Sequence, residues 1–145
     1  MNLKRYFSAS LAVYLVYLGL GFLINAVILK PTYDSLKSIW RPGMESLLWI
    51  EWVNGLIVSF LMTYIFTKGY EGKGIMEGVR FGLIIGVFLS VPVAYGTYMI
   101  FPIPYYLALQ WFLYGTAQFT VLGAVAAAVY KPAASSAPGT RTASA

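Results

Sequence analysis

The sequence contains no cysteine and no histidine, and charged residues make up only 10% of its 145 positions. Without cysteine, disulfides, thiol redox centres and Cys-ligated zinc or haem are excluded. Without histidine, imidazole acid–base catalysis and His-ligated haem are excluded as well. A metal or pigment could be held only by carboxylate, amide, backbone or water ligands. We therefore predict no catalytic residue, no metal site and no enzymatic activity.

Long apolar runs are present instead, and 59% of the residues are hydrophobic. Four runs each exceed the ~20 residues that a helix needs to cross a hydrocarbon core of about 30 Å. They cover residues 7–29, 47–67, 75–101 and 107–130. We expect an all-α membrane protein, a four-helix transmembrane bundle formed by residues 1–130. The Ala-, Ser- and Pro-rich segment 131–145 is expected to be a flexible cytoplasmic tail.

Basic residues are distributed unevenly between the two sides of such a bundle. Four spans place both termini on one side, together with the loop at 68–74. That side carries seven of the ten basic residues, Lys4, Arg5, Lys68, Lys73, Arg80, Lys131 and Arg141, against Lys30, Lys37 and Arg41 on the other. The positive-inside rule then predicts cytoplasmic termini in a bacterial inner membrane. The bases form no patch, so nucleic acid is not an expected partner.

The opposite, outer side is rich in aromatic residues, which favour the membrane–water interface. They include Tyr33, Trp40, Trp49, Trp52, Tyr98, Tyr105, Tyr106 and Trp111. Between the first two spans, Tyr33, Leu36 and Trp40 recur at roughly helical spacing until Pro42-Gly43 ends the pattern. This pattern predicts a short interfacial helix, and an irregular loop anchored by Trp40 is the alternative.

Small residues recur every four positions in three of the spans, where close helix packing in lipid depends on them. The three stripes are Gly55, Ser59 and Thr63; Gly78, Gly82, Gly86, Ser90 and Ala94; and Thr116, Thr120 and Ala124. Each step of four residues advances a stripe by about 40° around its helix. We expect the longest stripe to wind across two neighbouring helices, or to dock on another subunit.

One carboxylate lies clearly inside an apolar run. Glu51 is about 6 Å below the outer end of the second span by helix rise, and Asn54 borders the same face. Asn25, Thr97 and Gln110 fall at similar depth, so converging faces would make a polar cluster for a ligand or ion. Intramembrane carboxylates are costly and often functional. The alternative is structural: Glu51 bonds to a neighbouring amide or helix end, or reaches the interface.

The segment 68–74 (KGYEGKG) is rich in glycine but does not match a phosphate-binding loop. No strand precedes it, and no Ser or Thr follows Lys73. We expect a flexible turn there. Glu77 and Arg80, three residues apart, are expected to form an exposed ion pair at the start of the third span.

Four strings resemble those of a bacterial group of four-span membrane proteins with no assigned activity. They are Trp40-Arg41-Pro42, Tyr70 to Gly74, Glu77 to Leu83, and Phe101-Pro102-Ile103-Pro104. The resemblance implies the four-span architecture over most of residues 1–132. It also implies an acidic residue and a Trp-His pair late in the first span, where this chain has Gly21, Ile24 and Asn25. That departure removes titratable groups and favours a scaffolding role over proton coupling.

These features favour a non-catalytic integral membrane protein, an accessory or scaffolding subunit of a larger membrane complex or a homo-oligomer. Its expected partners are the lipid bilayer and other transmembrane subunits or a second copy. No cofactor is predicted, although a bound lipid or an apolar cofactor would fit. A second hypothesis is a small transporter or channel that uses Glu51. A third is a lipid or quinone binder at the outer aromatic rim.

Overall fold

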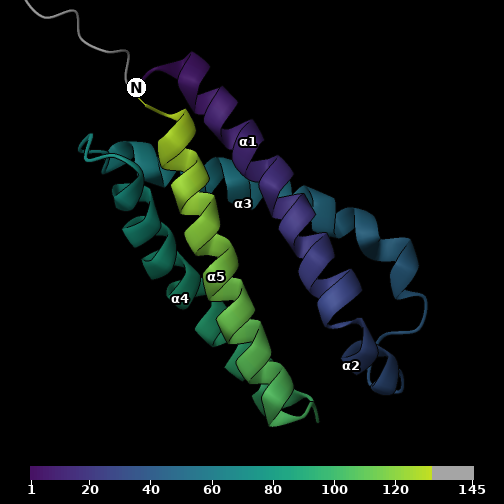
Figure 1. The fold of residues 1–145 in the computed structure, drawn as a ribbon. Helices are drawn as coiled ribbons and strands as arrows, with labels where there is room; N and C mark the ends of the chain where they lie inside the picture. Colours follow the sequence, from purple (N-terminus) through teal and green to yellow (C-terminus); the bar gives the residue numbers. More distant parts are fainter. Residues whose placement is uncertain (132–145) are drawn as a thin grey trace, which may run out of the picture.

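The computed structural model describes residues 1–131, so the predicted tail lies outside the described residues beyond Lys131. The elements are α1 (Leu3–Phe22), a π-helical turn η1 (Leu23–Ile28), α2 (Lys30–Ser35), a 3-10 turn η2 (Met44–Leu47), α3 (Leu48–Lys68), α4 (Ile75–Ile100) and α5 (Tyr105–Val129) (Figure 1). No strand occurs among residues 1–131. Four helical segments are long and apolar enough to cross a membrane: Leu3–Ile28, Met44–Lys68, Ile75–Ile100 and Tyr105–Val129. The predicted all-α fold with four such helices is confirmed.

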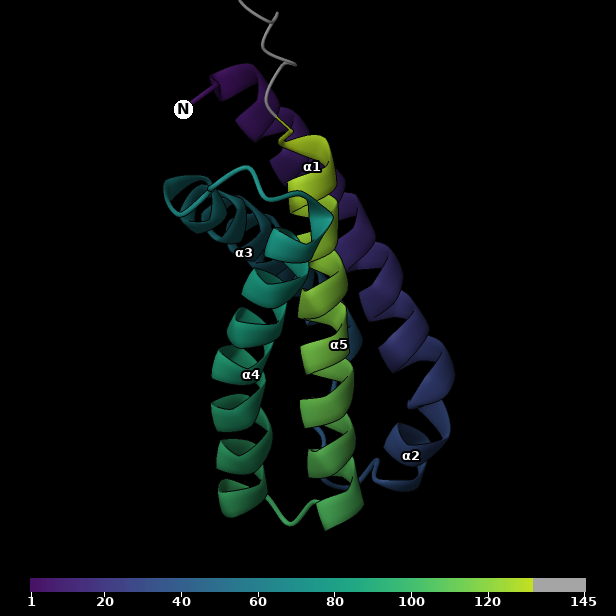
Figure 2. The ribbon, with the colours of Figure 1, turned by 60° about the vertical axis from the view of Figure 1, so that its left-hand side comes forward.

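The long helices form two packed pairs, α4 with α5 and α1 with α3, and the contact between α1 and α5 joins the pairs. α4 lies beside α5 along its length, and α1 packs against both α3 and α5. α3 begins beyond α1 and crosses behind α1 and α5 before it meets the start of α4 (Figure 1). Away from the loop that joins them, α3 and α4 therefore diverge (Figure 2).

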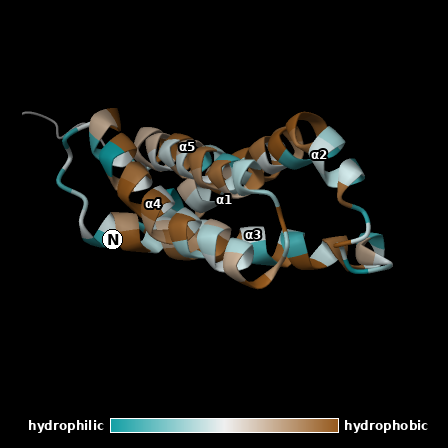
Figure 3. Cartoon of the chain, turned by 90° about the horizontal axis from the view of Figure 1, so that it is seen from below, coloured by the Kyte–Doolittle hydropathy of each residue, from teal (hydrophilic) through white to brown (hydrophobic). Residues whose placement is uncertain are grey.

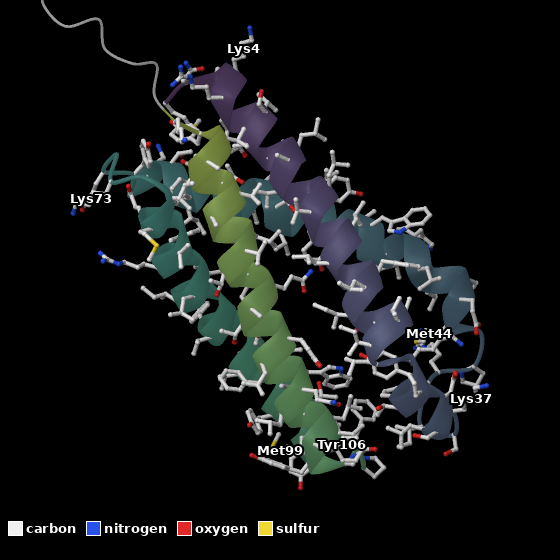
Figure 4. All side chains as sticks on the ribbon, in the orientation of Figure 1. Lys4, Lys37, Met44, Lys73, Met99 and Tyr106 are labelled. Carbon is white, nitrogen blue, oxygen red and sulfur yellow. The ribbon has the colours of Figure 1, made fainter. Side chains whose placement is uncertain are left out.

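The two ends of the bundle carry different segments. The N-terminus, the loop at 69–74 and the end of α5 lie at one end (Figure 1), where the Arg5 guanidinium donates to the Lys131 carbonyl oxygen. α2 and the connection between α4 and α5 lie at the other end. Figure 4 shows Lys4 and Lys73 at the first end, and Lys37, Met44, Met99 and Tyr106 at the second. Both described chain ends thus share one end of the bundle, as an even number of spans requires.

Apolar side chains dominate the outer surface of the long helices. In Figure 3 these helices are mainly brown, the colour of hydrophobic residues, while α2 is drawn largely in paler and hydrophilic shades. Among the most exposed side chains are Phe88 (72%) and Met99 (80%). Such a surface is unfavourable in water and is matched by a hydrocarbon environment.

Glycines bring the backbones of α4 and α5 into direct contact. A Cβ atom placed on Gly82 would lie 2.3 Å from the Phe119 carbonyl oxygen. A Cβ atom on Gly78 would lie 2.1 Å from the Gly123 carbonyl oxygen. Because these neighbours are backbone atoms, a larger residue could be accommodated only if the two helices moved apart. Lack of space, rather than an unusual dihedral angle, therefore requires glycine here.

The longest small-residue stripe is buried over its full length, at Gly78, Gly82, Gly86, Ser90 and Ala94. The expectation that it winds across two neighbours is wrong. Within residues 1–131, α4 packs along its length against α5 alone. Residues spaced four apart form a ridge that is inclined to the axis of their helix. A single partner helix that crosses at a matching angle can therefore contact the whole ridge.

The α5 side of this contact differs in part from the predicted stripe. Thr116 and Thr120 lie against the α4 glycines, as expected. The predicted Ala124 is only half-buried, and Gly123 and Ala127 meet Gly78 instead. The four-residue spacing departs from the actual contact in the last third of α5, where the contacting residue is Gly123, one position before the predicted Ala124.

The stripe on α3 faces α1. Gly55, Ser59 and Thr63 are buried, and a Cβ atom on Gly55 would lie 2.6 Å from the ring of Tyr17 in α1. Here the close neighbour is an aromatic side chain rather than backbone. Further along the same contact, the Tyr6 hydroxyl donates to the Phe60 carbonyl oxygen at 3.0 Å.

The loop at 69–74 is held by Glu77. The expected Glu77–Arg80 ion pair is not found within residues 1–131. Instead, the Glu77 carboxylate accepts hydrogen bonds from the backbone N–H groups of Glu71 (2.5 Å) and Lys73 (2.8 Å). Lys73 pairs with Glu71, and its hydrogen bond and charge lower the pKa of the Glu71 carboxyl. A carboxylate in the first turn of α4 thus holds the turn, together with the ion pair inside the loop.

Candidate functional site

A chain of hydrogen bonds centred on Tyr33 ties α2 to two of the long helices. The Tyr33 hydroxyl donates to Asn25 Oδ1 at 2.8 Å and accepts from Trp111 Nε1 at 2.7 Å. Trp40 Nε1 donates to the Tyr33 carbonyl oxygen at 3.0 Å. Burial raises the pKa of the Tyr33 phenol, so the hydroxyl stays protonated and can serve as the donor to Asn25.

The rings around Tyr33 also pack on one another. The Tyr33 and Trp40 centroids are 5.7 Å apart in an edge-on arrangement, and those of Trp40 and Trp111 are 6.4 Å apart. Beneath them lies a buried apolar cluster made of Leu29, Ile103, Leu107 and Ala108. The connection between the first two spans contains a short helix, α2, but it ends at Ser35. Leu36 and Trp40, which the predicted helix included, lie in the turns that follow. This connection packs on the start of α5.

The π-helical turn η1 determines where Asn25 lies. It replaces the last α-helical turn of the first span, and the Leu29 N–H reaches back to the Ile24 carbonyl oxygen at 2.8 Å. Asn25 Nδ2 donates to the Gly21 carbonyl oxygen at 3.0 Å, which fixes the amide orientation and turns Oδ1 towards Tyr33. Such π-helical turns are rare and recur at functional sites.

A first pocket of about 510 Å³ opens beside this aromatic group, and we call it the rim pocket. Its polar side chains are Glu51, Asn54 and Asn25, with the Tyr33 ring beside them. Its other walls are apolar or aromatic, made of Trp40, Met44, Leu47, Leu48, Ile50 and Trp111. A volume of this size lies within the usual range of small-molecule sites, about 300–1,000 Å³.

A second pocket of about 540 Å³, the deep pocket, is lined by residues of all four long helices, among them Tyr17 of α1, Val58 of α3, Val93 of α4 and Gln118 of α5. Asn25, Tyr33 and Trp111 border both pockets. The hydrogen-bonded group therefore forms a wall that the rim pocket and the deep pocket share.

Glu51 lies in the first turn of α3, where the partial positive charge of a helix N-terminus favours a carboxylate. Its Oε1 accepts a hydrogen bond from the Tyr17 hydroxyl at 2.8 Å. The carboxylate borders the rim pocket and also a smaller pocket of about 370 Å³ beside α1. Glu51 thus bonds to a tyrosine that sequence reasoning did not single out, rather than to Asn54 or Asn25.

The polar residues predicted to converge are only partly brought together. Glu51, Asn54 and Asn25 share the rim pocket, whereas Thr97 borders the deep pocket and donates to the Val93 carbonyl oxygen of its own helix at 2.6 Å. Gln110 lines neither pocket, and its buried Oε1 has no hydrogen-bond partner among residues 1–131. Helix rise predicts depth correctly but not the direction in which a side chain points.

Two polar residues that link helices were missed. Tyr17 bonds to Glu51 of α3, and Gln118 Nε2 of α5 donates to the Tyr17 carbonyl oxygen at 3.2 Å. Gln118 also lines the deep pocket. An amide in the middle of an apolar span is a signal that could have identified Gln118. Tyr17 gave no such signal, because tyrosines are frequent in this chain.

The side chains that line the rim pocket determine what kind of molecule the pocket suits. Within residues 1–131, no group of three acidic side chains is placed to hold a metal ion. The rim pocket combines one carboxylate, two amides and a phenol with a large apolar wall. This composition suits a molecule with an apolar body and one polar end.

Comparisons with known proteins add no assignment. A scan against protein-family models, a search of curated proteins and a search of solved structures each find no match to this chain. The resemblance to the bacterial four-span group therefore stays a prediction.

Proposed function

We propose that this chain is a non-catalytic integral membrane protein that binds an amphiphilic molecule, such as a lipid, in the rim pocket. The observation that carries the proposal is the pocket's composition, with Glu51, Asn54 and Asn25 facing an apolar and aromatic wall. An amphiphile could place its polar end against the carboxylate and amides. Its apolar body would then lie against Trp40, Leu47 and the neighbouring apolar side chains. This proposal corresponds to the third hypothesis from the sequence, a lipid or quinone binder at the outer aromatic rim.

Filling the rim pocket tests this proposal. We expect Leu47→Trp to occupy the apolar wall and to lower the amount of lipid that stays with the purified protein by about fivefold or more, a change of about 1 kcal/mol in binding. Native mass spectrometry of protein released from detergent micelles measures that amount. Leu61→Trp is the matched control, because Leu61 is in the same apolar segment, Met44–Lys68, is 57% exposed and lines none of the pockets described above. Equal lipid retention by both variants would contradict the proposal.

An accessory role in a larger complex has less support than the sequence suggested. The small-residue stripes were its main motivation, and they pack against other helices of the same chain. They are therefore not free to receive a partner helix. Self-association or a partner subunit would have to use the more exposed apolar faces instead.

We also propose that the protein lies in a bacterial inner membrane with both termini in the cytoplasm. The support is the excess of basic residues at the end that carries the N-terminus and the loop at 69–74. The chain has no cysteine, so single cysteines can be labelled without background. We expect Lys37→Cys and Tyr106→Cys to react with an impermeant maleimide on intact cells. Lys4→Cys and Lys73→Cys should react only after permeabilisation, and the reverse pattern would contradict this orientation.

Transport coupled to Glu51 is the second candidate. It is favoured by the position of the carboxylate between two pockets. Tyr33, Asn25 and Trp111, which border both the rim pocket and the deep pocket, would then lie on a transport path through the two pockets. Flux measured in liposomes that is lost in Glu51→Gln, with the fold intact, would support transport over simple binding.

A further inference from the structure

We propose that the molecule held in the rim pocket carries a positive charge at its polar end, as an amine or quaternary ammonium does, and that Glu51 binds this head group. The inference rests on the proposed amphiphile binding and adds the charge of the ligand. It is carried by the charges, hydrogen bonds and ring positions around Glu51.

Glu51 contributes the only formal charge among the residues that line the rim pocket. The ion pairs found within residues 1–131 are Lys30–Asp34 (3.3 Å), Lys37–Asp34 (3.9 Å) and Lys73–Glu71. Glu51 takes part in none of them. Two lysines near this end of the bundle are thus engaged by Asp34, and no described cation neutralises Glu51.

The Glu51 carboxylate is also incompletely hydrogen-bonded. Tyr17 donates to Oε1, and within the described part of the chain no donor reaches Oε2. An ammonium group would supply both the missing charge and, if it is a primary amine, the missing donors. A phosphate or carboxylate head group would be repelled instead.

The aromatic walls add a second attraction for a cation. Trp40, Tyr33 and Trp111 form one side of the rim pocket and pack within 6.4 Å of one another, centroid to centroid. Indole and phenol faces attract ammonium groups, most strongly where water is excluded. A carboxylate and three aromatic rings that line the same pocket therefore favour an amphiphilic cation over a neutral amphiphile of the same shape.

A matched pair of probes tests this inference. Dodecyltrimethylammonium is a cation, and dodecyldimethylamine N-oxide at pH 8 carries no net charge on the same chain. Binding to the protein in phosphatidylcholine nanodiscs can be followed by tryptophan fluorescence, with empty nanodiscs correcting for partition into lipid. We expect Glu51→Gln to weaken binding of the cation by about tenfold, the loss of one charge–charge attraction. Binding of the N-oxide should change by less than about twofold, because that probe does not rely on the charge of Glu51.

Glu45→Gln is the control, because it removes a carboxylate in η2, at the same end of the chain's second span, that does not line the pocket. It should leave the affinity for both probes unchanged. Glu51→Asp keeps the charge and should retain the preference for the cation, which makes the test independent of the folding of Glu51→Gln. Equal effects of Glu51→Gln on both probes, or no effect on either, would overturn the charge assignment while leaving amphiphile binding in place. Failure of both probes to bind the wild-type protein would overturn the proposed function as well.

Discussion

Gly82→Ala should destabilise the protein by about 2–3 kcal/mol, a large effect for a single added methyl group. The new Cβ would lie 2.3 Å from the Phe119 carbonyl oxygen and 2.9 Å from the Thr120 Cα. Both neighbours are backbone atoms of α5, so no rotamer change relieves the overlap. The helices would have to separate, and the contacts at Gly78 and Gly86 would weaken with them.

The measurement is the free energy of unfolding in mixed micelles as the fraction of denaturing detergent is raised. Gly96→Ala is the matched control, because it is on the same helix and a Cβ there meets nothing within 4 Å. Alanine is the better helix former by roughly 0.5–1 kcal/mol, so the control should be unchanged or slightly stabilised. A Gly82→Ala protein as stable as the Gly96→Ala protein would show that α4 and α5 do not meet through their backbones.

Tyr33→Ala should strongly destabilise the end of the bundle that carries α2. It removes the hydrogen bonds to Asn25 and Trp111 and the edge-on contact with Trp40. It also leaves a void between the rim pocket and the deep pocket. We expect a loss of about 3 kcal/mol, typical of truncating a packed aromatic side chain. Tyr33→Phe, which removes only the hydroxyl, should lose about 1 kcal/mol, since interhelical hydrogen bonds in membranes are modest.

Tyr106→Ala provides the comparison for this second prediction. Tyr106 is near the same end of the bundle, is 52% exposed and makes none of the hydrogen bonds described at the site. Its truncation should change stability by less than about 0.5 kcal/mol. Hydrogen exchange of the α2 amides gives a local readout, and it should accelerate in Tyr33→Ala only. If Tyr33→Ala and Tyr106→Ala behave alike, the Tyr33 group does not hold α2 in place.

Several features of the candidate site could be predicted from residue type and depth. Glu51, Asn54 and Asn25 were expected to share a polar region, and they border one pocket. Gln110 was expected there too, yet it lines neither the rim pocket nor the deep pocket. Distance along a helix axis follows from residue number, whereas the rotation of each helix about its axis follows from packing. Tyr17 and Gln118 were missed for the same reason, since their roles depend on which helices are adjacent.

The number, length and apolar character of the helices could be derived from the chain alone, because crossing a hydrocarbon layer demands only a sufficiently long apolar run, a local property. The burial of Gly78, Gly82 and Gly86 also followed from their regular spacing. Three features could be seen only in the tertiary structure. The α4 stripe packs against α5 alone, a π-helical turn directs Asn25 towards Tyr33, and α3 leaves space beside α4. These features depend on how the helices are inclined and rotated against one another, and that geometry results from the contacts of all of them together.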